Sequence, residues 1–174
     1  EPKGVSIEQL ETMGPPRSWL HVTGGYQDLH SAISTSGTIE LEALLVPLKQ
    51  SPQQKTISVL VETRSEHLLD LFKQYHFFTD TIPEKKSFMA THGEEFSRQR
   101  DITGMLVSGL ISRGNRQKLL KLAQETNLEL SDNVIFLSEG KEPPRWRGVF
   151  FALVGLLGIL RFFFIKTSKP GVAP

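Results

Sequence analysis

The stretch TISVLVETRSEHLLDLFKQYHFF, residues 56–78, contains both kinds of secondary structure on which the fold depends. Every second residue from Ile57 to Val61 is apolar, which is the pattern of a strand with one buried face. From Leu68 to Tyr75 the apolar residues recur at helical intervals instead. Thr63 and Glu66 have the spacing of a capping box, so the sequence predicts that the helix begins there. A strand that leads directly into a helix predicts a domain of mixed class.

The preceding residues predict two more strands. In TIELEALLV, residues 38–46, apolar positions alternate with Glu40 and Glu42, as in a strand half exposed to water. Pro47 is expected to place that strand at a sheet edge or to end its pairing. The polar segment 49–55 then predicts a hairpin to the strand at 56–62. Another strand is expected over 18–26, with a bulge or tight turn at its glycine pair.

The rest of the chain up to residue 142 adds five expected segments. Residues 1–16 predict a short helix, capped by Ser6 with Gln9 and ended by a Gly-Pro-Pro sequence. Residues 79–100 are polar and irregular, which is typical of a long connection. A strand is expected over 102–112, bent at Gly104 and Gly109, followed by a helix that Asn115 caps and a last strand over 133–139. The helix over 115–123 would present Leu119, Leu122 and Ala123 on one face.

These elements predict an α+β fold, with a mostly antiparallel or mixed β-sheet and two principal helices, followed by one C-terminal transmembrane helix. Residues 1–16 are expected to form a capped helix and proline-rich connector, and residues 17–142 the α+β domain. The span is expected over 146–166 and a polar tail over 167–174.

The membrane prediction rests on residues 148–165, which are apolar or glycine except for Arg161. Eighteen helical residues rise about 27 Å, the lower limit for crossing a hydrocarbon core, and Trp146 with Lys166 lengthens the segment. Arg161 is five residues from Lys166, so its side chain can extend to the interface. A buried helix of a soluble domain is the alternative, but such a helix normally carries a polar stripe. The expected interface anchors are Arg145, Trp146, Arg147, Arg161 and Lys166.

Three further features of the membrane prediction concern topology and partners. Basic residues are balanced on the two sides of the segment, so orientation is undetermined. Gly155 and Gly158 would let another helix approach closely, which predicts contact with other integral membrane proteins besides the lipid bilayer. The chain starts with Glu1 rather than Met, which leaves open a removed signal peptide or an additional N-terminal span.

Composition argues against several classes of function. The net charge is +1, so no strong field attracts nucleic acid, and the absence of cysteine excludes thiolate metal sites and disulfides. Glycines 104, 109 and 114 have half of a phosphate-loop pattern, but Leu110 and Asn115 stand where that loop needs lysine. We therefore expect no nucleotide, no metal and no cofactor, since the five histidines also lack zinc-type spacing.

One polar cluster is the candidate for chemistry or docking. A histidine beside two carboxylates is suited to acid and base catalysis if folding shifts one pKa, whereas mixed charges also suit a solvated loop or a polar docking loop. The residues are His92, Glu94, Glu95, Arg98, Arg100 and Asp101. The aromatic patch at 72–78 is expected in the core, and any exposed part would mark a protein or membrane contact.

The layout of a β-containing domain closed by a C-terminal span resembles that of subunits and assembly factors of membrane complexes. LVSGLISRGNRQKLLKLA, residues 106–123, is similar to the strand, turn and helix of BON-type domains, and no function is transferred from it. The sequence predicts a non-catalytic single-pass membrane protein that serves as accessory subunit, scaffold or assembly factor. The alternative is a membrane-tethered enzyme with its site at residues 92–101.

Overall fold

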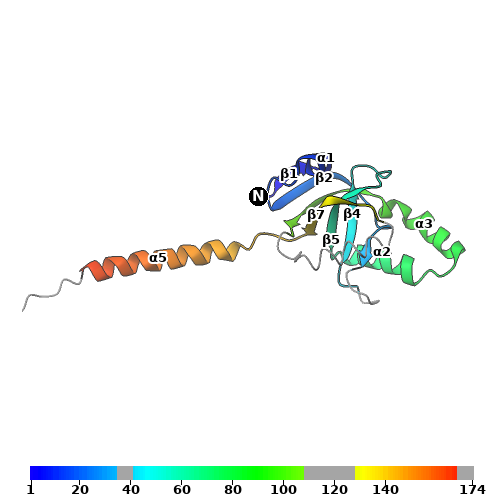
Figure 1. The fold of residues 1–174 in the computed structure, drawn as a ribbon. Helices are drawn as coiled ribbons and strands as arrows, with labels where there is room; N and C mark the ends of the chain where they lie inside the picture. The colour runs from blue at the N-terminus through cyan, green and yellow to red at the C-terminus, as the bar shows by residue number, and fades with distance from the viewer. Residues whose placement is uncertain (35–40, 108–127, 168–174) are drawn as a thin grey trace, which may run out of the picture. The chain divides into compact units, whose positions relative to one another are not determined.

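A mixed sheet closes on itself to form a barrel at the centre of the fold (Figure 1). The structure is a computed structural model that describes residues 1–34, 41–107 and 128–167, and within the last helix it describes the side chains of residues 148 and 150–162. The chain divides into two compact units, residues 1–142 and 143–174. The strands are β1 (Lys3–Ser6), β2 (Trp19–Gln27), β3 (Ile33–Ser34), β4 (Leu44–Lys49), β5 (Ile57–Thr63), β6 (Gln99–Leu106) and β7 (Leu130–Glu139).

Five of these strands form the closed barrel. Its order is β2-β6-β7-β5-β4, and β4 pairs back onto β2 through Tyr26 opposite Lys49 and Gln27 opposite Leu48. All neighbours are antiparallel except β5 and β7, which run in parallel. β1 extends the sheet beside β2, and β3 pairs with β4. The predicted α+β class with a mixed sheet is therefore confirmed.

The connectivity of this barrel is that of an OB-type fold, with a helical insert between the third and fourth barrel strands. In such folds the outer face of the second and third strands often binds ligands. Here the corresponding strands, β4 and β5, are mostly buried. Leu45 and Leu60 belong to an apolar cluster with Phe136 of β7. The shared topology consequently describes the architecture and transfers no function.

Two helical segments complete the apolar core of the barrel. Helix α1 (Ile7–Met13) contributes Ile7 and Leu10 to a cluster with buried residues of β2, β5, β6 and β7. Helix α2 (Glu66–Phe77) contributes Leu68 and Phe72 to a second cluster, which includes Phe96 at the end of helix α3 (Ile82–Phe96).

The predicted N-terminal helix is confirmed, but the strand that precedes it was not predicted. The Ser6 and Gln9 side chains form the expected capping box, and α1 ends at Gly14, whose φ is 74°. Residues 3–6 form β1, which pairs with β2 in parallel. This pairing depends on a neighbour distant in sequence, so no local pattern indicated it.

Pro47 does not end the pairing of β4, because the strand continues through this residue and pairs with Leu60 of β5. Within the described residues the other side of Pro47 is paired with neither β3 nor β2, so the position is locally an edge. The carbonyl of Pro47 accepts a hydrogen bond from the backbone N–H of Asp28. A strand residue directs both of its backbone groups to the same side. The side of Pro47 that lacks an N–H therefore faces away from β5, towards the side on which β4 pairs first with β3 and then with β2. The ladder of hydrogen bonds between β4 and β5 loses no bond. Of the predicted strand at 38–46, residues 38–40 lie outside the described residues, residues 41–43 are not in a strand, and β4 starts at Leu44.

The region 79–100 is the main error of the sequence prediction. It is largely helical, because Thr81 and Glu84 form a capping box at the start of α3 and Pro83 lies in the first turn. The expected cap of α2 is also wrong. Ser65 is the N-cap of that helix, while the Thr63 hydroxyl accepts a hydrogen bond from the Ser65 backbone N–H. The strands expected at 18–26, 56–62 and 133–139 are confirmed as β2, β5 and β7.

The second unit contains helix α5 (Arg145–Thr167), which has 23 residues. Its large apolar side chains between Phe150 and Phe162 are exposed. Among the residues described, no helix is both long and apolar enough to cross a membrane. The second principal helix expected at 115–123, Gly109 and most of the BON-like segment lie outside the described residues.

Candidate functional site

The polar residues expected to form one site are divided between a helix and a strand. His92, Glu94 and Glu95 lie in the last turns of α3, whereas Arg100 and Asp101 lie on β6. The predicted polar loop is thus a helix end followed by a strand. Asp101 accepts a hydrogen bond from the Gly24 backbone N–H at 3.0 Å, and Arg100 pairs with Glu139 at 2.6 Å. These two contacts hold β6 to β2 and β7 respectively. Arg98, between the two elements, and Glu94 are exposed.

A smaller cluster forms where α2 and α3 meet. Glu95 is 2.5 Å from Nε2 of His67 on α2 and 3.1 Å from Nδ1 of His92 on its own helix. The hydrogen bond with His67, followed by that with His92, holds the pKa of the Glu95 carboxyl below its ordinary value. The backbone carbonyl of Glu95 also accepts a bond from the side chain of Gln27, which is buried on β2. The arrangement therefore fastens both helices to the barrel.

The geometry of this cluster is better suited to a structural contact than to catalysis. The His67 side chain is 61 % exposed and the Glu95 side chain 30 %, so both lie on open surface. A lowered pKa keeps Glu95 ionised at neutral pH, whereas a general acid needs a raised one. Within the described residues no group of three or more histidine, aspartate or glutamate side chains is arranged to hold a metal ion.

Sequence reasoning missed two features of this region. His67 is 28 residues from Glu95, and the contact becomes predictable only if residues 82–96 are recognised as a helix that packs beside α2. The Thr81 and Glu84 capping box was the available signal for that helix. The other missed feature is the ion pair of Asp28 with Lys49 at 2.5 Å, which connects the end of β2 to β4.

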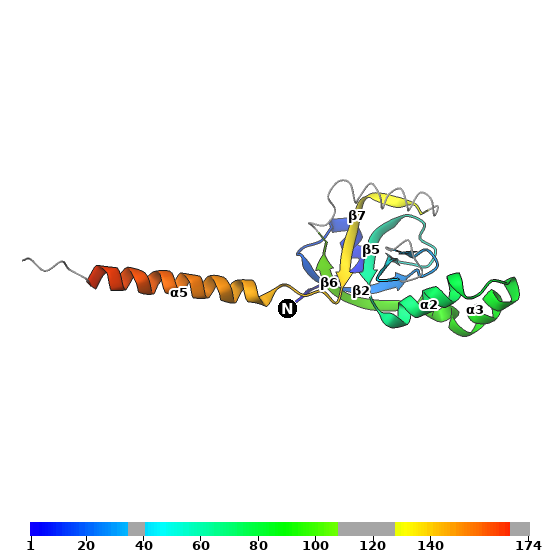
Figure 2. The same cartoon turned by 90° about the horizontal axis from the view of Figure 1, so that it is seen from below.

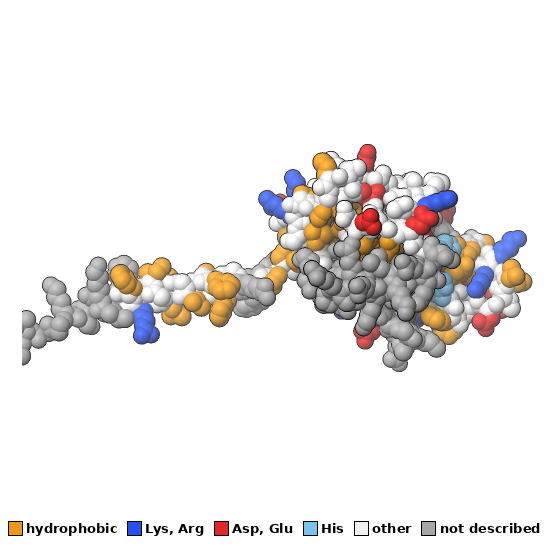
Figure 3. All heavy atoms as spheres, viewed as in Figure 1, with side chains coloured by type: hydrophobic (Ala, Val, Ile, Leu, Met, Phe, Trp, Pro, Cys, Tyr) orange, Lys and Arg blue, Asp and Glu red, His pale blue; other side chains and the backbone are white. Residues whose placement is uncertain are grey.

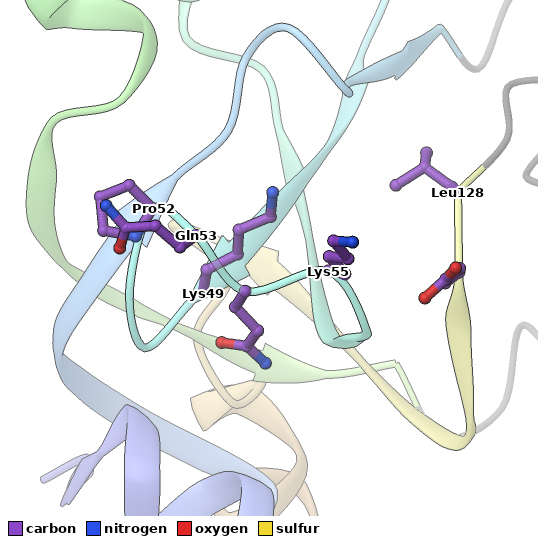
Figure 4. Close-up of a pocket in the computed structure, with 7 residues that line it drawn as sticks. Lys49, Pro52, Gln53, Lys55 and Leu128 are labelled. Atoms are coloured by element: carbon purple, nitrogen blue, oxygen red, sulfur yellow. The ribbon is translucent and has the colours of Figure 1, made fainter.

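A shallow hollow lies beside the turn between β4 and β5 (Figure 4). Its volume is about 320 Å³, and its lining residues are Lys49, Pro52, Gln53, Gln54, Lys55, Leu128 and Glu129. Small-molecule sites are usually lined by apolar and aromatic side chains, whereas these are mostly polar. Lys49 is already paired with Asp28, and Gln54 donates hydrogen bonds to Glu11. Two of its polar side chains, Lys49 and Gln54, are thus already bonded to residues outside the hollow.

The turn between α2 and α3 presents apolar side chains to solvent. Phe77, Phe78 and Ile82 are 41 %, 68 % and 85 % exposed. Behind them, Tyr75, Phe88 and Phe96 pack against one another, with ring centroids 5.3–6.1 Å apart. The aromatic patch expected in the core is consequently divided, because its inner part is packed and its outer end is exposed.

Helix α5 also carries exposed apolar surface. Arg161 is exposed, and a Cβ on Gly155 or Gly158 would meet no heavy atom within 4 Å. The side chains of Arg145, Trp146, Arg147 and Lys166 are outside the described set, so their role as anchors stays a prediction.

The chain matches no protein-family model, no curated protein and no solved structure.

Proposed function

We propose that this protein is a non-catalytic membrane protein, in which α5 attaches the barrel unit to a bilayer and the barrel serves as accessory subunit, scaffold or assembly factor of a membrane complex. The observation that carries the proposal is the solvent-exposed apolar surface of α5. Nine large apolar side chains, distributed between Phe150 and Phe162, are each at least 45 % exposed. They point in all directions round the helix, and a helix that is apolar all round is normally buried in protein or lipid.

A bilayer is the environment that matches both the sequence and the charge placement of this helix. The 23 residues of α5 would extend about 34 Å. Arg145, Trp146 and Arg147 at one end, with Arg161 and Lys166 at the other, would then lie among the headgroups. The proposed location is a membrane, with a single C-terminal span and the side of the barrel unit undetermined.

In this proposal the protein would contact the other members of the complex through two kinds of surface. Gly155 and Gly158 have open space beside them, so a helix of another integral membrane protein can approach there. The barrel would supply the contacts outside the bilayer. Neither role requires nucleotide, nucleic acid or cofactor.

Membrane attachment is tested by extraction of the full chain from membranes with alkaline carbonate. The wild type should stay in the pellet. Replacing both Leu153 and Leu157 with lysine should release the chain, because each charge near the centre of a span costs about 3 kcal/mol. The matched variant with alanine at both positions should remain in the pellet. Release of the wild type would refute the attachment.

Partner binding is tested by detergent solubilisation and identification of the proteins that co-purify. Isoleucine at both Gly155 and Gly158 should remove an integral membrane partner while the chain stays in the membrane. The control is Leu160→Ala, on the opposite side of the helix. A wild-type chain that is extracted alone would contradict the accessory-subunit proposal.

The alternative is a membrane-tethered enzyme, which the contact of Glu95 with two imidazoles supports. Alanine substitution of His92, Glu94 and Glu95 separates the two proposals. A folded variant that still assembles with its partners but loses an activity would favour the enzyme and contradict the scaffold.

A further inference from the structure

The turn between α2 and α3 forms the outer end of a helical hairpin that projects from the barrel (Figures 1 and 2). Figure 3 shows hydrophobic side chains at this end, with basic and acidic side chains beside them. The most exposed are Phe78 and Ile82, which lie in the turn and at the first position of α3, and Phe77 precedes them. We call these three residues the apolar tip.

The backbone of the apolar tip is held in place by hydrogen bonds. The Thr79 hydroxyl donates to the carbonyl of Tyr75 at 2.6 Å. The Glu84 carboxylate accepts from the backbone N–H groups of Asp80 and Thr81, and the Thr81 hydroxyl completes the capping box. The apolar side chains are therefore presented by a fixed turn, which reduces the entropy lost when a partner covers them.

Basic side chains flank the apolar tip on both helices. Lys73 precedes it by one helical turn on α2, while Lys85 and Lys86 follow in the first turns of α3. The ammonium group of Lys85 lies 5.6 Å from the centre of the Tyr75 ring. An apolar group bordered by lysines matches a bilayer interface, where acyl chains receive the apolar part and anionic headgroups attract the cations.

The topology of the barrel brings the base of this hairpin next to the segment that leads towards α5. β5 and β7 are parallel neighbours, with Glu62 opposite Ser138 near their carboxyl ends. α2 follows β5 after two residues, and the segment 140–142 follows β7. Both therefore leave the barrel from adjacent strand ends, as Figure 2 shows. The segment that leads towards α5 thus starts beside the base of the hairpin.

We infer that the apolar tip inserts into the interface of the same membrane to which α5 attaches the chain, with Lys73, Lys85 and Lys86 on anionic lipid headgroups. This inference rests on the proposed membrane attachment. It gives the barrel unit a second contact with the bilayer, besides the one through α5. Such a contact would restrict how the barrel turns over the membrane surface.

The absence of cysteine permits a direct test, because a single introduced cysteine can carry a polarity-sensitive fluorophore. The full chain is reconstituted into phosphatidylcholine vesicles with or without phosphatidylglycerol. Three labelled variants are compared: Ile82→Cys in the apolar tip, Gln53→Cys in the turn at the opposite end of β5, and Leu153→Cys in α5. Ile82 and Gln53 are both exposed, so neither substitution disturbs the core.

The expected result is a blue shift of the fluorophore at position 82 and its quenching by lipids spin-labelled near the headgroup. The signal should be weaker without phosphatidylglycerol, or when both Lys85 and Lys86 are replaced by glutamate. The fluorophore at position 53 should behave as in water. The one at position 153 should be quenched by lipids labelled deep in the acyl chain, which tests the attachment separately.

Two results would overturn the inference. If position 82 resembles position 53 while position 153 is quenched, the attachment holds and the apolar tip does not touch lipid. A blue shift at position 82 without quenching by spin-labelled lipids would mean that protein, such as a second copy of the chain, covers the tip. If the fluorophores at positions 82 and 153 are both unquenched by spin-labelled lipids, the proposed attachment through α5 fails as well.

Discussion

Gly104 of β6 lies directly against the backbone carbonyl group of Ser138 on β7. A Cβ at residue 104 would overlap the carbonyl oxygen of Ser138 and lie 2.9 Å from its carbon. The two strands are paired at this point, with Gly104 opposite Glu139. Because the obstacle is backbone rather than a flexible side chain, only glycine fits without moving a strand.

Gly104→Ala should therefore destabilise the barrel by about 2–3 kcal/mol, the usual cost of forcing extra atoms into a packed interior. Urea denaturation of the full chain in detergent measures the change. Gly4→Ala on β1 is the control, because a Cβ there meets no heavy atom within 4 Å. Equal stability of the two variants would show that β6 and β7 are less closely paired than described.

The ion pair of Asp28 with Lys49 supports the place where the barrel closes. Burial alone would raise the pKa of Asp28, but hydrogen bonds from Lys49 and Ser31 lower it below 3.8. The charged carboxylate therefore stabilises the folded state. Asp28→Asn should cost about 1–3 kcal/mol near neutral pH, because the partly buried ammonium of Lys49 loses its partner.

The pH dependence of this contribution follows from the sign of the shift. A carboxyl whose pKa is lower in the folded state contributes fully above its ordinary value of 3.8, and the contribution decreases as the pH falls through the folded-state pKa. The stability of Asp28→Asn should accordingly fall less steeply in that acidic range. Arg64→Ala is the control, since Arg64 is 76 % exposed and its pair with Glu62 should contribute less than about 1 kcal/mol.

The elements that the sequence predicted correctly are those with local signals. β5 alternates apolar residues, α2 repeats them at helical intervals, and α1 has a capping box and a terminal Gly14. α3 was missed because its apolar residues are sparse and only Phe96 is fully covered. Its cap was present in the sequence, but a polar surface helix has no strong periodicity.

Closure of the barrel depends on relationships that no local pattern contains. Gly25 allows β2 to approach β4, since a Cβ there would lie 2.5 Å from Cγ of Leu48. The sequence suggested a bulge at this glycine pair but not which strand it faces. The contact of His67 with Glu95 likewise exists only because α2 and α3 lie side by side. For the candidate site, residue types were therefore predictable and their grouping was not.

Glu95 provides a test of the contact between α2 and α3. Its pKa is lowered by hydrogen bonds from His67 and His92, so its charge stabilises the fold above the ordinary value of 4.5 and this contribution is lost as the pH falls through the folded-state pKa. Glu95→Gln should cost about 0.5–1 kcal/mol at neutral pH, because the pair is largely exposed to solvent. The measurement is urea denaturation at several pH values.

Glu94→Gln is the matched control for this prediction, since Glu94 is an exposed neighbour on the same helix turn. It should change stability by less than about 0.5 kcal/mol. If both variants unfold alike over the whole pH range, the contact of Glu95 with the two histidines contributes nothing to the packing of the helices.

Buried Phe96 at the end of α3 and exposed Phe78 in the turn should respond very differently to truncation. Phe96 is fully buried and lies 4.7 Å from the His30 ring and 5.3 Å from the Tyr75 ring, measured between centroids. Phe96→Ala should destabilise the fold by about 3–5 kcal/mol, because it removes a packed ring and leaves a cavity. Phe78→Ala should cost less than about 0.5 kcal/mol, since that side chain is 68 % exposed. Urea denaturation compares the two, and a large loss at Phe78 would show that the apolar tip is part of the folded core rather than a surface left for a partner.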